Sequence, residues 1–383
     1  MRAIGLLMAV FLSGVLLAGA PVFSDEPTPP PAPTADEALR NSIKKALESL
    51  ASVQDRNTGV IGDQSYRLAT TSMAGMAFLS GGNVPGRGLY GRNVEMAIRF
   101  ILDNAVTPSG YLQLDGSNMY SHGFAALFLA ESYGMIPPYT KLQPRVLKAL
   151  KKAVDLLERC QSPEGGWWYN PQKNSGGQGA DISVTVCETN ALRAARNCGV
   201  AVDKRVIENA LKCVKSAQNN NDGGFSYRVY VGRGGEGGSE FPRSAGAVCI
   251  LQTLGKWDDA ETQKGIKYLK DKTKGGLVSV NWYFYAVYYM SQAMFMSGDA
   301  NWNEWWPKIR EDLLKKQQPD GSWQGQEGGK GFGTAVALII LQMPYRYLPI
   351  YQEGIEKAPP TPAEGGGGAP APPEGSGEVP PAP

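Results

Sequence analysis

One turn pattern recurs along this chain and constrains its fold more than any other feature. Glutamine is followed by a glycine turn and then by an aromatic residue at residues 161–167, 218–225 and 318–323, and a degenerate copy stands at 54–60. A single repeat cannot bury its own apolar face, so repeated units must stack on one another to form a core. Internal repetition therefore predicts the architecture before any single residue is interpreted.

The turn glycines define six units of about fifty residues each. With two weaker copies at Gly110 and Gly276, they stand at positions 59, 110, 166, 224, 276 and 321. Segments before the turns, such as 146–157, 206–214 and 309–314, have the spacing of helices with one apolar face. Segments after the turns, such as 123–130, 245–251 and 334–341, lack a broad charged face, which is typical of buried helices. A charged outer ring of helices around an apolar inner ring satisfies both patterns, provided that the array closes.

With these turns the chain resembles the terpenoid cyclase and protein prenyltransferase superfamily, which includes squalene cyclase-like proteins and other proteins with the prenyltransferase repeat. The resemblance covers roughly residues 40 to 350. It implies an all-α fold, an α/α toroid of six helical hairpins, in which the second helix of each hairpin lines a central cavity. The inner helices are then expected to begin near Arg67, Tyr120, Asp181, Phe241, Trp282 and Gly333. Since one fold hosts many functions, the resemblance implies architecture more than chemistry.

The two ends of the chain differ in composition from its middle. Residues 1–20 combine Arg2, an apolar run and the small residues 18–20, which predicts a cleaved signal peptide and export to the periplasm, the exterior or the cell surface. An uncleaved membrane anchor is the alternative, disfavoured by the short apolar run. No segment of the mature chain is expected to span a membrane. A Pro-rich spacer (21–38) and a Pro-, Gly- and Ala-rich tail (353–383) are predicted to be disordered around a toroid at 39–352.

Composition and charge exclude one class of partner. Hydrophobic residues make up 42% of the chain and charged residues 19%, which suits a globular domain. The net charge is only +2, and no stripe of Lys and Arg with interleaved aromatic residues is present. Nucleic-acid binding needs many phosphate contacts, so it is not expected.

The position at which squalene-type cyclases keep their acid is altered in this chain. In that family the proton donor is the middle aspartate of an Asp-x-Asp-Asp-Thr-Ala run. The similar run at 181–192 keeps Asp181 and Thr185, but Ser183 and Val184 replace the acid and its neighbour. A serine hydroxyl is too weak an acid to protonate an alkene, so cyclisation by that route is predicted to be lost. Asp181 is expected either to cap a helix or to stand at the cavity mouth.

The zinc ligands of protein prenyltransferases are also replaced. That family binds zinc through an aspartate and a cysteine two residues apart and through a later histidine. Here Ser279 and Asn281 stand in the first region, and Gly333 and Thr334 stand near the place of the histidine. A zinc site needs three or four N, S or carboxylate ligands that converge. No metal and no cofactor are therefore predicted.

Two other titratable residues are catalytic candidates beside Asp181. His122, the only histidine, opens the second implied inner helix and either faces the cavity or bonds to a neighbouring loop. Glu188 shares a helix face with Asp181, seven residues away, and so allows a paired-carboxylate site. Alternatively, Glu188 pairs with Arg193 or with Arg243 of a neighbouring helix.

Aromatic residues concentrate in the fifth unit, between 282 and 295. Aromatic rings offer both the apolar contact and the negative π density that an isoprenoid pocket needs. The ligand-binding candidates are Tyr120, His122, Asp181, Arg243, Trp282, Tyr285 and Tyr289. Because the cyclase acid and the zinc ligands are missing, we expect an exported, non-catalytic binding or scaffolding module for an apolar small molecule or a peptide. The alternative is a divergent terpenoid cyclase or prenyltransferase-like enzyme that acts on an isoprenoid.

Overall fold

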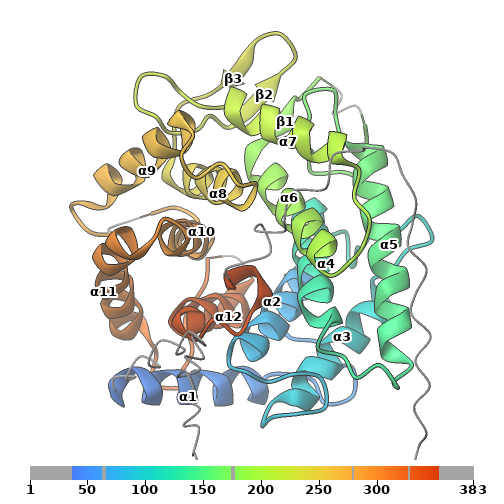
Figure 1. Ribbon diagram of the computed structural model, residues 1–383. Coiled ribbons are helices and arrows are strands. Elements are labelled where there is room, and N and C mark those ends of the chain that lie inside the picture. The colour runs from blue at the N-terminus through green and yellow to red at the C-terminus, as the bar shows by residue number, and fades with distance from the viewer. Residues whose placement is uncertain (1–36, 63–65, 174–176, 278–279, 327, 353–383) are drawn as a thin grey trace, which may run out of the picture. The chain divides into compact units, whose positions relative to one another are not determined.

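The computed structural model describes residues 37–62, 66–173, 177–277, 280–326 and 328–352 (Figure 1). The predicted signal peptide, the predicted tail and nearly all of the predicted spacer lie outside them. Among the described residues no helix is both long and apolar enough to cross a bilayer. These residues form twelve α-helices, of which the even-numbered ones are α2 (Arg67–Ser80), α4 (Met119–Tyr133), α6 (Ile182–Asn197), α8 (Phe241–Thr253), α10 (Tyr283–Met296) and α12 (Gly329–Gln342). The odd-numbered helices are α1 (Glu37–Ser52), α3 (Gly91–Asn104), α5 (Leu142–Cys160), α7 (Lys204–Ser216), α9 (Ala260–Thr273) and α11 (Asp299–Lys316).

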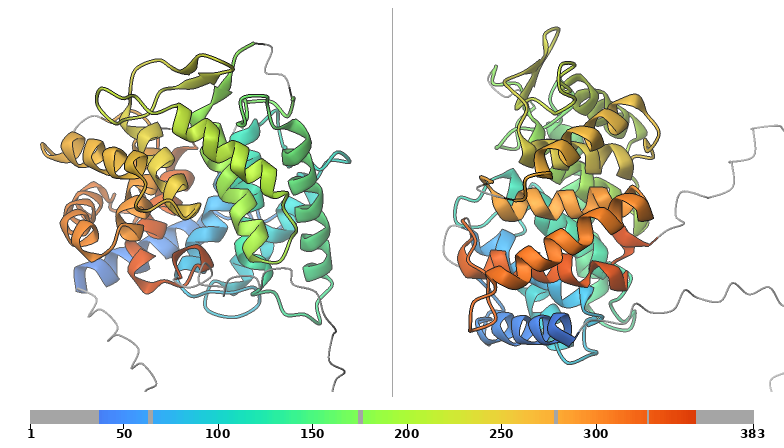
Figure 2. Two further views of the ribbon diagram at one scale, coloured as in Figure 1. Left: turned by 45° about the horizontal axis from the view of Figure 1, so that its top comes forward. Right: turned by 90° about the vertical axis from the view of Figure 1, so that its left-hand side faces the viewer.

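The even-numbered helices form a closed inner ring. Each packs against the next in the order α2, α4, α6, α8, α10 and α12, and α12 packs back against α2. The odd-numbered helices lie outside this ring, as Figures 1 and 2 show from several directions. The predicted α/α toroid is thereby confirmed. Helices α2 and α8 begin at the predicted residues, α4, α6 and α10 begin within one residue of them, and α12 begins four residues early, at Gly329.

Burial explains why the two kinds of helix occupy different rings. Outer helix α7 buries only Val206, Ala210, Cys213 and Val214, which form one stripe. Inner helix α12 buries every residue from Gly333 to Gln342. A helix with one apolar stripe is stable at the surface, whereas a helix that is apolar all round must be covered on all sides.

The turn glutamines tie neighbouring repeats together. Nε2 of Gln161 donates to the carbonyl oxygens of Gly165 and Val206, both at 2.8 Å, so one side chain joins its own turn to the first turn of α7. Gln317 makes the same pair of bonds to Gly321 and Ser42, each at 3.0 Å, and thereby links the last repeat to α1. The predicted turn glutamine at 318 is therefore corrected by one residue. The corresponding bonds join Gln54 to Gly59 and Asn93, and Gln218 to Gly223 and Glu261.

A second recurring bond joins each of these turns to its inner helix. The backbone N–H of Trp167 donates to Oγ1 of Thr185 at 3.1 Å. The same bond runs from Ile61 to Thr71, from Phe225 to Ser244 and from Trp323 to Thr334, at 2.9 to 3.0 Å. Because buried backbone N–H groups need a partner, a side chain that accepts hydrogen bonds is required at this helical position.

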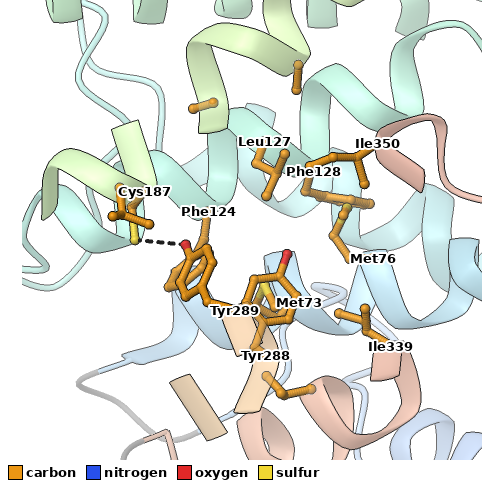
Figure 3. Close-up of a cluster of buried hydrophobic side chains, with 14 of the residues drawn as sticks. Met73, Met76, Phe124, Leu127, Phe128, Cys187, Tyr288, Tyr289, Ile339 and Ile350 are labelled. Carbon is orange, nitrogen blue, oxygen red and sulfur yellow. Dashed lines mark hydrogen bonds between the residues drawn. The ribbon is translucent and has the colours of Figure 1, made fainter. Parts of the chain in front are cut away.

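Side chains fill the centre of the ring toward the C-terminal ends of the inner helices. Figure 3 shows Met73 of α2, Phe128 of α4 and both Tyr288 and Tyr289 of α10 meeting there, with Ile350 beside them. Ile350 belongs to a short 3-10 helix, η3 (Pro349–Tyr351), which follows another, η2 (Met343–Tyr345). The backbone N–H of Ile350 donates to Oε2 of Glu131 at 3.1 Å, which holds this segment against the ring. A cavity in the centre of the ring must therefore open at the other end.

A small antiparallel sheet is the one addition to the predicted all-α architecture among the described residues. It consists of β1 (Ala180–Asp181), β2 (Arg228–Tyr230) and β3 (Gly234–Glu236), in that order. Ala180 pairs with Val229, and the N–H of Ile182 donates to the carbonyl oxygen of Tyr227 at 3.1 Å. The sheet thus fixes the third and fourth turns to each other beside the N-terminal end of α6.

Candidate functional site

A cavity of about 460 Å³ opens at the N-terminal ends of the inner helices. This volume falls within the roughly 300–1,000 Å³ typical of small-molecule sites. Its walls include residues from the beginnings of all six inner helices or from the residues just before them. Eight of the lining residues are aromatic, namely Tyr66, Tyr120, Phe124, Tyr169, Tyr227, Trp282, Tyr285 and Phe332.

The aromatic rings support one another in fixed orientations. The ring of Tyr120 lies between those of Tyr169 and Tyr285, with centroids 5.9 and 6.3 Å away, and meets Tyr285 edge to face. The rings of Phe124 and Phe332 also meet edge to face, with their centroids 6.0 Å apart and an angle of 61° between their planes. Edge-to-face and tilted pairs are favourable because the positive edge of one ring meets the negative face of another. The rings of the wall therefore hold one another in place.

Asp181 is connected to the cavity through tyrosine hydroxyl groups. Its Oδ1 accepts a hydrogen bond from the N–H of Val184 at 2.9 Å and caps α6, as one of its two expected roles requires. Its Oδ2 accepts from the Tyr169 hydroxyl at 3.0 Å, and the hydroxyl oxygens of Tyr169 and Tyr227 lie 2.6 Å apart. Burial raises the pKa of Asp181, and the hydrogen bonds from Val184 and the tyrosines oppose this shift. Both tyrosines line the cavity, whereas Asp181 lies behind them.

Glu188 forms neither of the arrangements expected from the sequence. It is fully buried, and in the described part of the chain neither carboxyl oxygen has a hydrogen-bond partner. Burial raises its pKa well above the usual value, because no hydrogen bond compensates the carboxylate for its lost hydration. Arg243 pairs instead with Glu240, at 3.0 Å. The structure does not bring Glu188 together with Asp181, which faces Tyr169.

His122 occupies the inner-helix position that bonds to a turn. Its Nδ1 accepts a hydrogen bond from the N–H of Leu112 at 3.0 Å, as Thr185 does from Trp167 in the next repeat. The side chain is fully buried and does not line the cavity. Burial lowers its pKa to about 3, so the imidazole is neutral near pH 7. Of the two expected roles, the structure shows the hydrogen bond to a neighbouring loop.

Four of the seven predicted ligand-binding candidates line the cavity: Tyr120, Arg243, Trp282 and Tyr285. Tyr289 does not, because its hydroxyl lies 3.4 Å from Sγ of Cys187 within the filled centre of the ring (Figure 3). Sequence reasoning missed Tyr169 and Tyr227. A signal was present, since each stands two residues after a turn aromatic, Trp167 or Phe225.

No metal centre is formed by the residues that the structure describes. Among them no three His, Cys, Asp or Glu side chains come close enough together to hold an ion. Of the positions that replace the prenyltransferase ligands, Ser279 lies outside the described residues. Thr334 accepts the hydrogen bond from Trp323 and is thus part of the turn structure.

Comparison with known proteins agrees with this architecture. Residues 139–290 match the squalene-hopene cyclase C-terminal domain family. Similar solved structures include the type II terpene cyclase MstE from Scytonema in complex with geranylgeranyl dihydroxybenzoate (TM-score 0.52, 15% identity, covering 81% of this chain and 98% of that one). Cellobiose 2-epimerase from Bacillus thermoamylovorans B4167 is also similar, with a TM-score of 0.58 and 14% identity, covering 80% of this chain and 98% of that one. A variant of the α-1,6-mannanase GH76A of Salegentibacter sp. HEL1_6 has a TM-score of 0.61 and 8% identity, covering 80% of this chain and 99% of that one.

The family match over residues 139–290 and the shared fold support the resemblance to terpenoid cyclases that the turn motifs indicated. The match covers part of the chain, and the structural neighbours include a terpene cyclase, an epimerase and a mannanase. At such low identity these likenesses show the α/α toroid alone, which carries several chemistries. No curated protein matches the chain in sequence.

Proposed function

We propose that this protein binds a small molecule with an apolar, isoprenoid-like body in the aromatic cavity and does not convert it. The observation that carries the proposal is the set of eight aromatic side chains that converge on one preformed cavity. Such rings offer a large apolar contact area with little conformational entropy to lose on binding. The likeness to a terpene cyclase solved with a geranylgeranyl compound supports an isoprenoid as the ligand class.

The placement of the acidic groups favours binding over turnover. Glu188 and His122 are buried away from the cavity wall. The Asp181 carboxylate is occupied by the N–H of Val184 and the hydroxyl of Tyr169. A general acid must reach the reacting atom directly or through one water, and none of these three groups lines the cavity.

One observation favours a second candidate, a divergent enzyme that acts on an isoprenoid. The hydrogen bonds from Asp181 to Tyr169 and on to Tyr227 connect a carboxylate with the cavity wall. If this path carries a proton to a substrate, Asp181→Asn abolishes turnover. If the protein only binds, the same variant gives no product because the wild type gives none.

We further propose that the protein works outside the cytoplasm, as the predicted signal peptide implies. An exported protein has no access to the prenyl diphosphates made inside the cell, whereas it can take up a hydrocarbon from a membrane. Fractionation of the native cells checks this: the mature chain is expected in the exported fraction, and recovery of the uncleaved chain from the cytoplasm contradicts it.

Native mass spectrometry with lipid extraction tests the binding function. Protein purified from its own cells is expected to carry one isoprenoid per chain. Phe332→Ala, which removes a wall of the cavity, is expected to lose it. Phe295→Ala is the matched control, because Phe295 contacts Trp302 and Tyr351 and does not line the cavity. An empty wild type, or equal retention by both variants, refutes the proposal, and conversion of an added isoprenoid favours the enzyme.

A further inference from the structure

We propose that the polar end of the ligand is a neutral group that donates hydrogen bonds, an alcohol rather than a diphosphate. The reason is that the protein itself takes up the hydroxyl protons of three neighbouring tyrosines of the cavity wall, Tyr169, Tyr227 and Tyr285, which leaves these three groups as acceptors. This inference rests on the proposed isoprenoid function and specifies the ligand's head group.

The hydrogen bonds around Asp181 use up the hydroxyl protons of two tyrosines of the wall. A tyrosine hydroxyl has one proton to donate and lone pairs with which to accept. Tyr169 donates to Oδ2 of Asp181, so within the 2.6 Å contact it accepts from Tyr227. If the order of the two tyrosines is reversed, both protons are again consumed inside the group. In either arrangement an ionised Asp181 leaves no proton of Tyr169 or Tyr227 for the cavity.

The same holds for a third hydroxyl on this wall. Tyr285 donates to the backbone carbonyl oxygen of Ser183 at 3.1 Å. Tyr120 packs between Tyr285 and Tyr169, so these hydroxyl-bearing side chains form one continuous part of the wall. Three tyrosine hydroxyl groups can therefore offer lone pairs to a ligand and no proton. A hydroxyl group on the ligand complements them, whereas an ether or a phosphate oxygen does not.

The charges on the wall argue against a diphosphate. Among the described lining residues, only Glu240 and Arg243 are charged, and they pair with each other at 3.0 Å. Arg243 also stacks over the ring of Tyr227, with 5.3 Å to the ring centroid. Diphosphates are held by several cationic groups or metal ions, and this pair leaves no net charge. The inner-helix N-termini at the mouth do favour negative charge, so a diphosphate is the informative competitor.

Three probes with one hydrocarbon body separate these head groups. Farnesol, its methyl ether and farnesyl diphosphate are titrated calorimetrically into the mature chain, residues 21–383. Farnesol is expected to bind roughly three- to tenfold more tightly than the ether, the effect of one or two neutral hydrogen bonds. It is also expected to bind more tightly than the diphosphate.

Two variants test the proton count rather than the shape. Asparagine caps helices as well as aspartate does, so Asp181→Asn preserves the start of α6. Its amide N–H₂ donates toward Tyr169 and releases a tyrosine proton to the cavity, and the preference for farnesol over the ether should fall to near one. Tyr285→Phe should lower the affinity for farnesol about threefold. Tyr111→Phe is the control, because Tyr111 also donates to a carbonyl at 3.1 Å but lies outside the cavity.

The outcomes distinguish this inference from the function on which it rests. Tighter binding of the ether or the diphosphate to the wild type overturns the inference and leaves isoprenoid binding intact. An unchanged farnesol preference in Asp181→Asn overturns it as well. If none of the three probes binds, both the isoprenoid function and the head-group inference are refuted.

Discussion

Replacing the turn glutamine Gln161 by leucine tests how the repeats are held together. Both hydrogen bonds that its Nε2 donates are buried, and they reach Gly165 in its own turn and Val206 in the next outer helix, 45 residues away. Its Oε1 accepts a longer bond from Asn209, at 3.4 Å. Leucine has nearly the same size, so the change removes two donors with little change in packing. The toroid is expected to remain folded but to lose stability.

The size of the loss follows from the burial of the two acceptors. A hydrogen bond contributes about 1 kcal/mol net, and a buried acceptor left without a partner costs about 1–3 kcal/mol. The carbonyl of Val206 belongs to α7 and still takes part in the hydrogen bonds of that helix. The larger cost therefore falls on the carbonyl of Gly165. We therefore expect Gln161→Leu to lower the free energy of unfolding by about 2–4 kcal/mol. Gln263→Leu is the control, because Gln263 donates to the carbonyl of Trp257 at 2.8 Å on the exposed surface, where water can replace it.

Urea unfolding followed by circular dichroism measures both effects. The midpoint should fall clearly for Gln161→Leu, and the free energy should change by less than about 0.5 kcal/mol for Gln263→Leu. If the two variants lose the same stability, the turn glutamines do not hold the repeats together in the way the hydrogen bonds indicate.

Three further substitutions have effects that can be worked out from the structure. Burial lowers the pKa of His122 to about 3, so its contribution to stability is complete above pH 6.5 and is lost as the pH falls. Threonine, the residue at this position in other repeats, does not titrate. The free energy of unfolding of His122→Thr should therefore rise by about 2 kcal/mol relative to that of the wild type as the pH falls from 7 to 5. Burial raises the pKa of Glu131 to about 7, so its contribution to stability is complete below pH 4.5 and is lost as the pH rises through 7. The free energy of unfolding of Glu131→Gln should therefore rise by up to about 3 kcal/mol relative to that of the wild type between pH 5 and 8. Parallel pH-dependent unfolding of variant and wild type would contradict either statement. A Cβ at Gly123 would lie 2.9 Å from Cβ of Cys187, so Gly123→Ala should cost about 1–3 kcal/mol in urea unfolding, and an unchanged midpoint would show that α4 and α6 do not pack this closely.

The repeat predicted the fold closely because each turn carries its own local signal. Five inner helices begin within one residue of their expected starts. The start of the sixth, α12, was predicted four residues too late, because Gly329 and Gly331 carry no helical signal. Phe332 in this first turn packs against Phe124, a tertiary contact that the local sequence does not reveal. Two consecutive glutamines made residues 317 and 318 indistinguishable by sequence. Only the bonds to Ser42 and Gly321 identify Gln317 as the turn residue.

The site was harder to predict than the fold, because helix periodicity does not say which side chains face the ring's open end. Tyr285 and Tyr289 stand one helical turn apart, yet only Tyr285 lines the cavity, since the centre of the ring is filled at the depth of Tyr289. His122 resembled a catalytic group because it is the only histidine. Its role in the structure became clear from the equivalent bond of Thr185 in the next repeat.

A crystal structure of residues 21–383 with farnesol tests the central claim most directly. The account predicts ligand density inside the cavity, with the hydrocarbon against Phe124 and Phe332 and the hydroxyl within hydrogen-bond distance of Tyr169, Tyr227 or Tyr285. Density only at another surface, or an aromatic cavity closed by its own side chains in the presence of saturating farnesol, would contradict it.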